Sequence, residues 1–282
     1  MSHARQVALL SAPLLLVVAC GEANYPDGLP ELPPAEAEGN PLGCLPDLDG
    51  VIADDELPVM VGASVRYIVS TEPRAVELEG RLEEEVRTWD LSRLEADDRS
   101  LSVTTRSATQ TWFADRLSAP ADAYLVPLDA AGALVGVMER RPGSLLIHGT
   151  VSAEEAPADG QTLLLYDQPI DLFRLPLDLA ADWSDEGEIN DGRVNGLTIA
   201  ARHTYHVRSL REGRLVLPDL TFDRVLQVAT HIHQVTVVGD PQDWVQVSFL
   251  TECYGEVARV TSELGVSTAD FTSAREVRRL GF

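Results

Sequence analysis

Hydrophobic and polar residues alternate through much of the chain after residue 59. In residues 76–82 apolar side chains take every second position, and in residues 225–238 Leu226 and Val228 alternate with Gln227. A period of two places successive side chains on opposite faces of a strand. Turn residues, as at 141–143 and 239–241, recur at roughly ten-residue intervals. We therefore predict a mainly β fold, a curved antiparallel sheet or half-barrel built as a meander with few short helices, in one β-rich domain of residues 59–282.

Three stretches interrupt the expected meander. Residues 169–179 contain two prolines, which lack the N–H that a central strand donates, so we predict a loop that packs across the sheet. The acidic residues 182–188 predict a solvated turn beneath a buried Trp183, and residues 211–213 predict another turn. The last strand that the pattern predicts covers residues 255–260.

The N-terminus has the features of an export signal in order. Arg5 precedes an apolar run that ends at residue 19, too short to span a bilayer and interrupted by Pro13. Its end, Val17-Val18-Ala19-Cys20, resembles the lipobox of bacterial lipoproteins, in which the cysteine is lipidated and the chain is cut before it. The resemblance implies that residues 1–19 are a signal peptide and that Cys20 is lipidated. The alternative is an ordinary signal peptide with a chance cysteine.

Residues 20–43 follow as a segment rich in Pro, Glu, Ala and Gly, which we expect to be a disordered tether behind the lipidated cysteine. Two acyl chains are enough for stable anchoring. In lipoproteins of this kind a residue other than aspartate after the cysteine, here Gly21, implies the outer membrane. The net charge of −23 opposes nucleic-acid binding. We therefore expect a cell-envelope protein that contacts the membrane through its lipid.

Two cysteines, Cys44 and Cys253, remain after Cys20 is assigned to the lipid. An even number of cysteines in an exported chain favours a disulfide, because such bonds persist outside the cytosol. We predict that Cys44 and Cys253 are bonded and tie the start of the folded body to a late strand. Two separate buried thiols are the alternative.

Residues 44–58 form an acidic loop that partly matches an EF-hand. Asp47, Asp49 and Glu56 fall at the third, fifth and twelfth loop positions, and Gly50 falls at the sixth. Leu45 stands where the first carboxylate belongs, and no second loop of this kind is present. The two interpretations are a single calcium site held by Asp47, Asp49 and Glu56, or an acidic turn that leads into a strand. We expect no other cofactor.

The histidines offer a weaker metal hypothesis. His231 and His233 lie two residues apart, so a strand places both on one face, and His206 in a neighbouring segment is a candidate third zinc ligand. Gln227 lies on the same predicted face, which indicates plain solvent exposure and no metal.

The C-terminal third has a second, broader resemblance. Residues 213–218, then Phe222 and residues 225–228, then residues 252–257 are similar to the C-terminal hairpins of uncharacterised exported bacterial lipoproteins. This resemblance implies a curved antiparallel half-barrel of the kind that periplasmic lipoprotein carriers use. It implies a fold and no activity.

Sequence motifs for catalysis are lacking. The chain contains no G-x-S-x-G elbow, no H-E-x-x-H, no phosphate-binding glycine loop and no dinucleotide fingerprint. We therefore expect a non-catalytic binding or structural domain that holds an apolar small molecule or contacts an envelope protein. The alternatives are an envelope hydrolase with a metal or a carboxylate pair, and a calcium-stabilised interaction module. A cavity lined by aliphatic residues would favour ligand binding, and a fully packed core a scaffold role.

Overall fold

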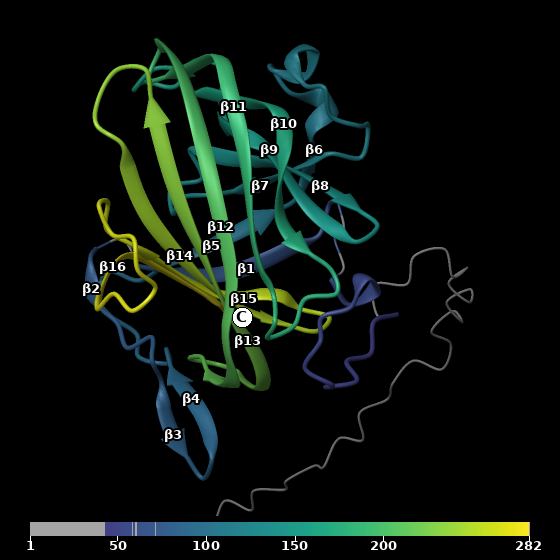
Figure 1. The fold of residues 1–282 in the computed structure, drawn as a ribbon, viewed down its shortest axis with the longest axis vertical. Helices are drawn as coiled ribbons and strands as arrows, with labels where there is room; N and C mark the ends of the chain where they lie inside the picture. The colour runs from purple at the N-terminus through teal and green to yellow at the C-terminus, as the bar shows by residue number, and fades with distance from the viewer. Residues whose placement is uncertain (1–42, 58, 60, 71, 282) are drawn as a thin grey trace, which may run out of the picture. The chain divides into compact units, whose positions relative to one another are not determined.

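One curved sheet dominates the computed structural model, which describes residues 43–57, 59, 61–70 and 72–281 (Figure 1). Neighbouring strands follow the order β5-β1-β16-β15-β14-β13-β12-β11-β10-β9-β8-β7-β6. Only Thr105 separates β5 from β6, so the two edges of the sheet meet on one segment of chain. The nearly closed, barrel-shaped antiparallel sheet confirms the predicted fold class.

The strands along this path pair antiparallel with their neighbours. They are β1 (Ser64–Val69), β5 (Arg99–Thr104), β6 (Arg106–Ser107), β7 (Tyr124–Pro127), β8 (Leu134–Arg141), β9 (Ser144–Ser152), β10 (Leu163–Arg174), β11 (Asp182–Val194), β12 (Leu197–Val216), β13 (Thr221–Thr236), β14 (Gln242–Thr251), β15 (Gly255–Ser262) and β16 (Ser273–Leu280).

Three further strands lie off the path. β2 (Arg74–Ala75) pairs with β16, and β3 (Arg81–Glu83) forms a hairpin with β4 (Val86–Asp90), which runs parallel to β12. The helices of the described residues are three 3₁₀ turns, η1 (Asp54–Glu56), η2 (Ala108–Gln110) and η3 (Ala114–Arg116). None of them has the length or apolar character to cross a membrane.

Side chains of the long central strands alternate between an inner and an outer face. Register pairs join Tyr205 to Ile232 and Ile232 to Trp244, so these three share the inner face. The adjacent positions, such as Ala229 and Val247, point outward. Both sets are largely buried, so the barrel has a core on each side of its wall.

Two excursions of the chain cover the outer face. Residues 76–91 lie over β12–β15, where Trp89 packs edge-on against Phe249 with ring centroids 5.2 Å apart. The segment that carries η2 and η3 packs Phe113 against the outer side of β7–β10. Gln227, expected at a solvent-exposed face, is fully buried because residues 76–91 lie over it. Its Nε2 donates to the Leu78 carbonyl at 2.8 Å.

The prediction of a loop at residues 169–179 is wrong for its first half. β10 continues through Pro169 to Arg174, and only the residues after Arg174 leave the sheet. Pairing with β9 shifts register between Leu165 and Ile170, so Pro169 lies in a bulge. A proline is tolerated there because no N–H is required for the ladder.

Two predicted turns are also strands. β11 begins at Asp182, with Trp183 and Ile189 buried while Glu186 and Glu188 are exposed, so these two glutamates belong to the outer half of an alternating strand. β12 continues through residues 211–213 because register shifts on both sides absorb the irregularity. A Cβ at Gly213 would lie 2.2 Å from the Arg87 carbonyl, so glycine permits the close approach of β4.

The last strand of the sheet is one that the sequence pattern missed. β16 follows the predicted final strand and joins β15 to β1, which is the step that brings the sheet round towards closure. Its sequence carries Arg275, Arg278 and Arg279, a composition that conceals a buried strand.

Residues 44–57 cover one end of the barrel. Ile52 pairs with Leu177 in the β10–β11 connection, and Asp54 accepts a hydrogen bond from the Gly143 N–H in the β8–β9 turn. Cys44 and Cys253 are joined, as predicted, by a disulfide that ties this segment to the β14–β15 turn. We call this the disulfide end.

Candidate functional site

A cavity of about 410 Å³ opens inside the barrel towards the opposite end. Its lining comes from β8–β10 and β12–β16, on both sides of the interior, together with residues of the β7–β8 connection. The connections β7–β8, β13–β14 and β15–β16 lie at this end, which we call the cavity end. The space lies in the size range of small-molecule sites in proteins.

The lining of the cavity is divided between apolar and polar side chains. The apolar part consists of Leu128, Leu134, Met138, Ile147, Leu172, Ile232 and Trp244. The polar part consists of Asp129, Thr150, Tyr205, Gln246, Arg259, Thr261, Arg275 and Glu276. A pocket of this composition suits a molecule with an apolar body and a polar end.

A buried aromatic network borders the cavity at Tyr205. The Tyr166 hydroxyl lies 2.7 Å from His203 Nδ1 and 3.3 Å from the Tyr205 hydroxyl. Burial lowers the pKa of His203 to about 4 and raises the pKa of both tyrosines. All three groups are therefore neutral at neutral pH, and this side of the cavity presents no charge.

Arginine side chains line the inner face beside the cavity. Arg259 on β15 and Arg278 on β16 are register partners, and both reach to carbonyls at the end of β7. The Arg259 Nη2 lies 3.4 Å from the Leu128 oxygen, and the Arg278 Nη1 lies 2.9 Å from the Pro127 oxygen. Positive charge is thus gathered inside a chain whose net charge is −23.

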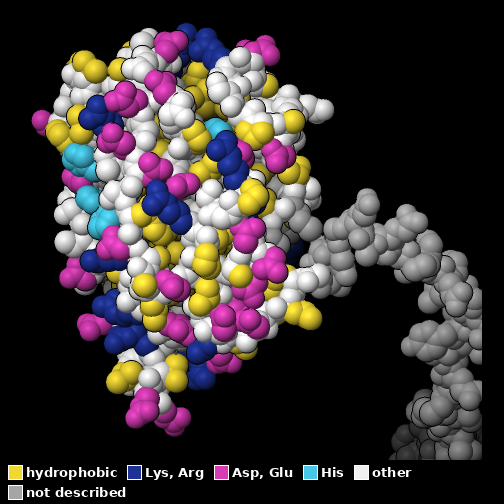
Figure 2. Space-filling view, turned by 45° about the vertical axis from the view of Figure 1, so that its right-hand side comes forward, with side chains coloured by type: hydrophobic (Ala, Val, Ile, Leu, Met, Phe, Trp, Pro, Cys, Tyr) yellow, Lys and Arg dark blue, Asp and Glu magenta, His cyan; other side chains and the backbone are white. Residues whose placement is uncertain are grey.

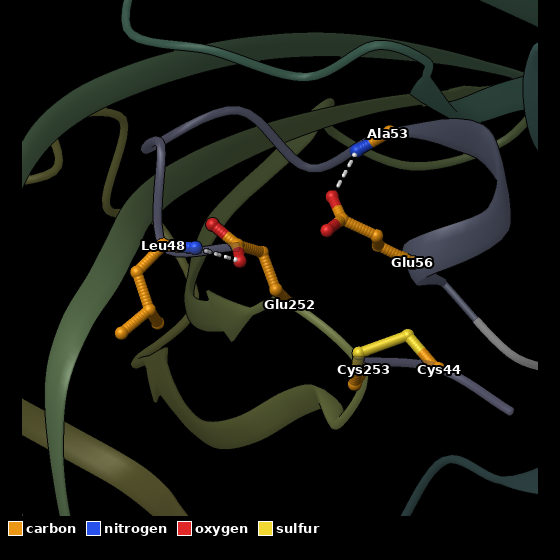
Figure 3. Close-up of a disulfide and its surroundings, with 6 residues drawn as sticks. All are labelled: Cys44, Leu48, Ala53, Glu56, Glu252 and Cys253. Atoms are coloured by element: carbon orange, nitrogen blue, oxygen red, sulfur yellow. Dashed lines mark hydrogen bonds between the residues drawn. A yellow bond between two sulfur atoms is a disulfide. The ribbon is translucent and has the colours of Figure 1, made fainter. Parts of the chain in front are cut away.

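The disulfide end holds a cluster of three carboxylates, of which Figure 3 shows Glu56 and Glu252. Asp47, Glu56 and Glu252 each place one oxygen within 4.8 Å of the others. Glu252 accepts hydrogen bonds from the backbone N–H groups of Leu48 at 2.7 Å and Gly50 at 3.4 Å, and Glu56 accepts from Ala53 at 2.9 Å. The cluster therefore fixes the path of residues 44–57.

Electrostatics in this cluster oppose ionisation of Glu56. Burial raises the pKa of its carboxyl, the Ala53 N–H lowers it, and the charges of Glu252, Asp47 and Asp49 raise it further. The net shift is upward. A bound cation would act in the opposite direction, because carboxylates are the ligands of Ca²⁺.

The predicted calcium ligands are brought together only in part. Asp47 and Glu56 meet in the cluster, whereas Asp49 uses an oxygen to accept the Val51 N–H at 2.7 Å and is not a member of it. Glu252, which the sequence analysis missed, completes the group. The predicted disulfide could have indicated Glu252, because a bond between Cys44 and Cys253 brings residue 252 beside this loop. Calcium binding itself stays a prediction.

The three histidines do not assemble into a zinc site. His206 and His231 are register partners, but His206 Nε2 bonds Asp182 at 2.8 Å, while His231 and His233 both bond one oxygen of Asp243 at 2.7 and 2.9 Å. Within the described part of the chain, the carboxylate cluster is the one group of three ligand atoms with metal-like spacing. Each histidine is instead paired with an aspartate of a neighbouring strand.

A groove of about 800 Å³ outside the cavity brings together a second set of titratable groups. Its lining includes His148, Arg141 and the carboxylates of Asp167, Asp171, Asp185 and Asp191. The His148 Nε2 lies 2.7 Å from Glu139 Oε2, and both side chains are buried. Burial raises the pKa of Glu139, but hydrogen bonds from Arg141 and His148 outweigh it, so the net shift is downward.

The surface carries charge of both signs. On the face drawn in Figure 2, acidic side chains are interspersed with arginine and with apolar side chains. The negative charge of this face is thus divided among many sites. The lipidation site Cys20, the signal peptide 1–19 and the tether 20–43 fall at or before the start of the described residues, which leaves those predictions as they stand.

Comparison of the chain with protein-family models, with curated proteins and with solved structures found no match.

Proposed function

We propose that this chain is a cell-envelope lipoprotein, anchored through Cys20, whose β-barrel binds a small amphipathic molecule without changing it chemically. The observation that carries the proposal is the cavity of about 410 Å³ inside the barrel, with its apolar and polar sides. A scaffold would need no such space, because protein interiors are otherwise packed to the density of organic crystals. The order of signal, lipobox and proline-rich segment supports the anchor.

Binding can be read out from Trp244, which lines the cavity. The full chain with Cys20→Ser keeps the export signal but lacks the sulfur that would carry lipid. We expect mass spectrometry of this purified variant, after denaturation, to detect a co-purified amphipathic compound near one equivalent. Titration with decanoate after delipidation is expected to change the tryptophan emission.

The matched controls are two tryptophan variants. Trp244→Phe should abolish the change in emission, whereas Trp112→Phe should retain it, because Trp112 packs with Phe113 on the outer side of the wall. The absence of any co-purified compound, together with unchanged emission for decanoate, decanol and decyl phosphate, would refute the binding function.

The groove at His148 favours one alternative, a hydrolase. A buried carboxylate that orients a histidine is the supporting half of a general acid–base site, and Glu139 and His148 have this arrangement. The test is hydrolysis of a series of nitrophenyl esters by the wild-type chain. The hydrolase would be favoured if His148→Ala abolished ester hydrolysis while the control variant Asp243→Asn retained it. A calcium-stabilised interaction module stays a prediction, and its test is calcium titration at the disulfide end.

A further inference from the structure

Arg259 is a buried cation with few close partners. Its side chain is 10% exposed, and it lines the cavity. The Nη2 lies 3.4 Å from the Leu128 oxygen and the Nη1 lies 3.7 Å from Glu256 Oε1, both longer than the usual 2.7–2.9 Å of a charge-assisted hydrogen bond. Its Nε has no hydrogen-bond partner. Buried guanidinium groups normally have their donors paired.

The Nε of the neighbouring Arg278 is also without a hydrogen-bond partner, but the terminal nitrogens of Arg278 are closer to their partners than those of Arg259. Its side chain is 2% exposed, its Nη1 donates to Pro127 at 2.9 Å, and its Nη2 donates to Glu276 at 3.3 Å. The guanidinium also lies over the Tyr67 ring at 5.7 Å. Arg278 therefore ties β16 to β7 and β1. The terminal nitrogens of Arg259 make only the two longer contacts, at 3.4 and 3.7 Å.

The charges around Arg259 do not provide it with a tight counterion. Glu256 turns its Oε2 to the Ser248 hydroxyl at 2.7 Å, and Glu276 is the partner of Arg278. Asp129 accepts the N–H groups of Ala133 and Leu134 in its own turn.

Two further arginines add positive charge to this side of the barrel. Arg275 lines the cavity on the same side as Arg259. The pKa of Arg278 is lowered first by burial and then by the charge of Arg259. Glu276 and Glu256 oppose this effect, so the arginine side is not defined by an excess of charge. The unpaired Nε and the two long contacts of Arg259 leave hydrogen-bond donors that an anion in the cavity would satisfy.

We infer that the ligand of the cavity carries an anionic headgroup on an aliphatic tail, and that Arg259, with Arg275, binds this headgroup. This inference rests on the proposed binding function and specifies its ligand class. A guanidinium presents paired N–H donors that match a carboxylate or a phosphate in two-point contact. The tail would lie against the aliphatic side of the cavity near Met138, Ile147 and Ile232.

The experiment compares headgroups on one tail. Calorimetric titration of the full-length Cys20→Ser chain uses decanoate, decyl phosphate, decanol and decyltrimethylammonium, each below its micelle concentration. We expect decanoate or decyl phosphate to bind about tenfold or more tightly than decanol, because hydrogen bonds to charged groups are about twice as strong as neutral ones. We expect the cationic amphiphile to bind most weakly. The relative affinities of the two anions assign the headgroup to a carboxylate or a phosphate.

Variants test the assignment to Arg259. Arg259→Gln should reduce anion affinity to the level of decanol and leave decanol binding unchanged. Arg275→Gln, at an exposed position that should tolerate substitution, should give a severalfold loss for the anions alone. Arg66→Gln is the control for net charge, because Arg66 is exposed on β1 and does not line the cavity. If Arg259→Gln does not fold, Arg275→Gln and the headgroup series of the unsubstituted chain still decide.

The outcomes separate the two levels of the proposal. Equal affinity for decanol and both anions, unaffected by either cavity variant, would overturn the headgroup inference and leave the binding function standing. Binding of no amphiphile at all would overturn both. A loss for Arg66→Gln equal to that for Arg275→Gln would show that long-range charge, and no headgroup contact, sets the affinity.

Discussion

The disulfide end and the cavity end of the barrel bury charges of opposite sign, and they do so by different means. At the disulfide end, Glu252 and Glu56 turn towards backbone N–H groups of residues 44–57, which fold back over the opening and are fastened by the disulfide. At the cavity end, Arg259 and Arg278 point into the barrel and reach across to β7.

This difference explains why one end of the barrel is filled by protein while the other end contains a cavity. Buried carboxylates can be satisfied by backbone donors of a short loop, so the disulfide end is filled by its own chain. Guanidinium groups present up to five donors in a fixed plane, which a wall of carbonyls satisfies only in part. Arg259, whose Nε is unpaired, lines the space that has room for a ligand.

Removal of the disulfide should have the largest effect on stability. The bond links cysteines 209 residues apart, and the chain-entropy account assigns a loop of this length about 5 kcal/mol. We expect the double variant Cys44→Ser/Cys253→Ser to lose about 3–5 kcal/mol of unfolding free energy in urea. Wild-type protein kept reduced is the matched control and should behave like the variant. A loss below about 1 kcal/mol would show that the disulfide end does not depend on its cross-link.

Arg278→Gln should destabilise the cavity end more than Arg259→Gln does. Loss of Arg278 leaves the Pro127 carbonyl without its donor in a partly buried site, at a cost of about 2 kcal/mol. Arg259 makes longer contacts, so its substitution should cost about 1 kcal/mol or less in the absence of ligand. Urea denaturation of both variants measures the difference. Equal losses would contradict the division of the two arginines into a structural residue and a headgroup-binding residue.

Alternation predicted the strands whose outer or inner half is apolar, but it failed where polar residues are themselves buried. β16 carries arginines that are buried because β1, β7 and residues 91–98 supply their partners, and no local pattern records partners so distant in sequence. β11 was missed for a different reason, because its exposed acids resemble a solvated turn and conceal the alternation with buried Trp183 and Ile189. Pro169 was misjudged because a bulge, which depends on the register of two strands, removed the need for its N–H.

The candidate sites show the same limit. Cysteine counting predicted the disulfide, and carboxylate spacing predicted the roles of Asp47 and Glu56 in one cluster. Glu252 lies about two hundred positions away, so only the cysteine pairing could have placed it there. The cavity was expected only as a property of a curved sheet. Arg259 lies on the predicted strand at residues 255–260, but Arg275 lies on β16, the strand that the pattern missed.

Glu56→Gln should remove one part of the pH dependence of stability at the disulfide end. The pKa of Glu56 is raised, chiefly by burial, so the folded state binds this proton more tightly than the unfolded chain, whose glutamate titrates near about 4.3. This group therefore lowers stability as the pH rises from about 4.3 through its folded-state pKa. We expect Glu56→Gln to gain about 1 kcal/mol or less at neutral pH and to flatten the acid-to-neutral slope.

Calcium provides the second measurement on the same variant. If the cation is bound, calcium should raise the melting temperature of the wild type and leave Glu56→Gln unchanged. Glu83→Gln, at an exposed position in β3, is the control for the loss of one acid. Equal melting temperatures of the wild type with and without millimolar calcium would dispose of the calcium prediction.

Asp243→Asn should give the smallest effect, with the opposite sign of pH dependence. The hydrogen bond from His233 lowers the pKa of Asp243, burial opposes this, and His231 lowers it further, so the net shift is downward. Its contribution is present above the unfolded value of about 3.9 and is lost as the pH falls through the folded-state pKa. Because the three side chains are partly exposed, we expect a loss of only about 0.5 kcal/mol in urea at neutral pH. Asp240→Asn, in the adjacent β13–β14 turn, is the matched control and should match the wild type. Below the lowered folded-state pKa of Asp243 the difference between Asp243→Asn and wild type should vanish. A difference that persists there would mean that Asp243 acts through packing at the cavity end and that its charge has no part in stability.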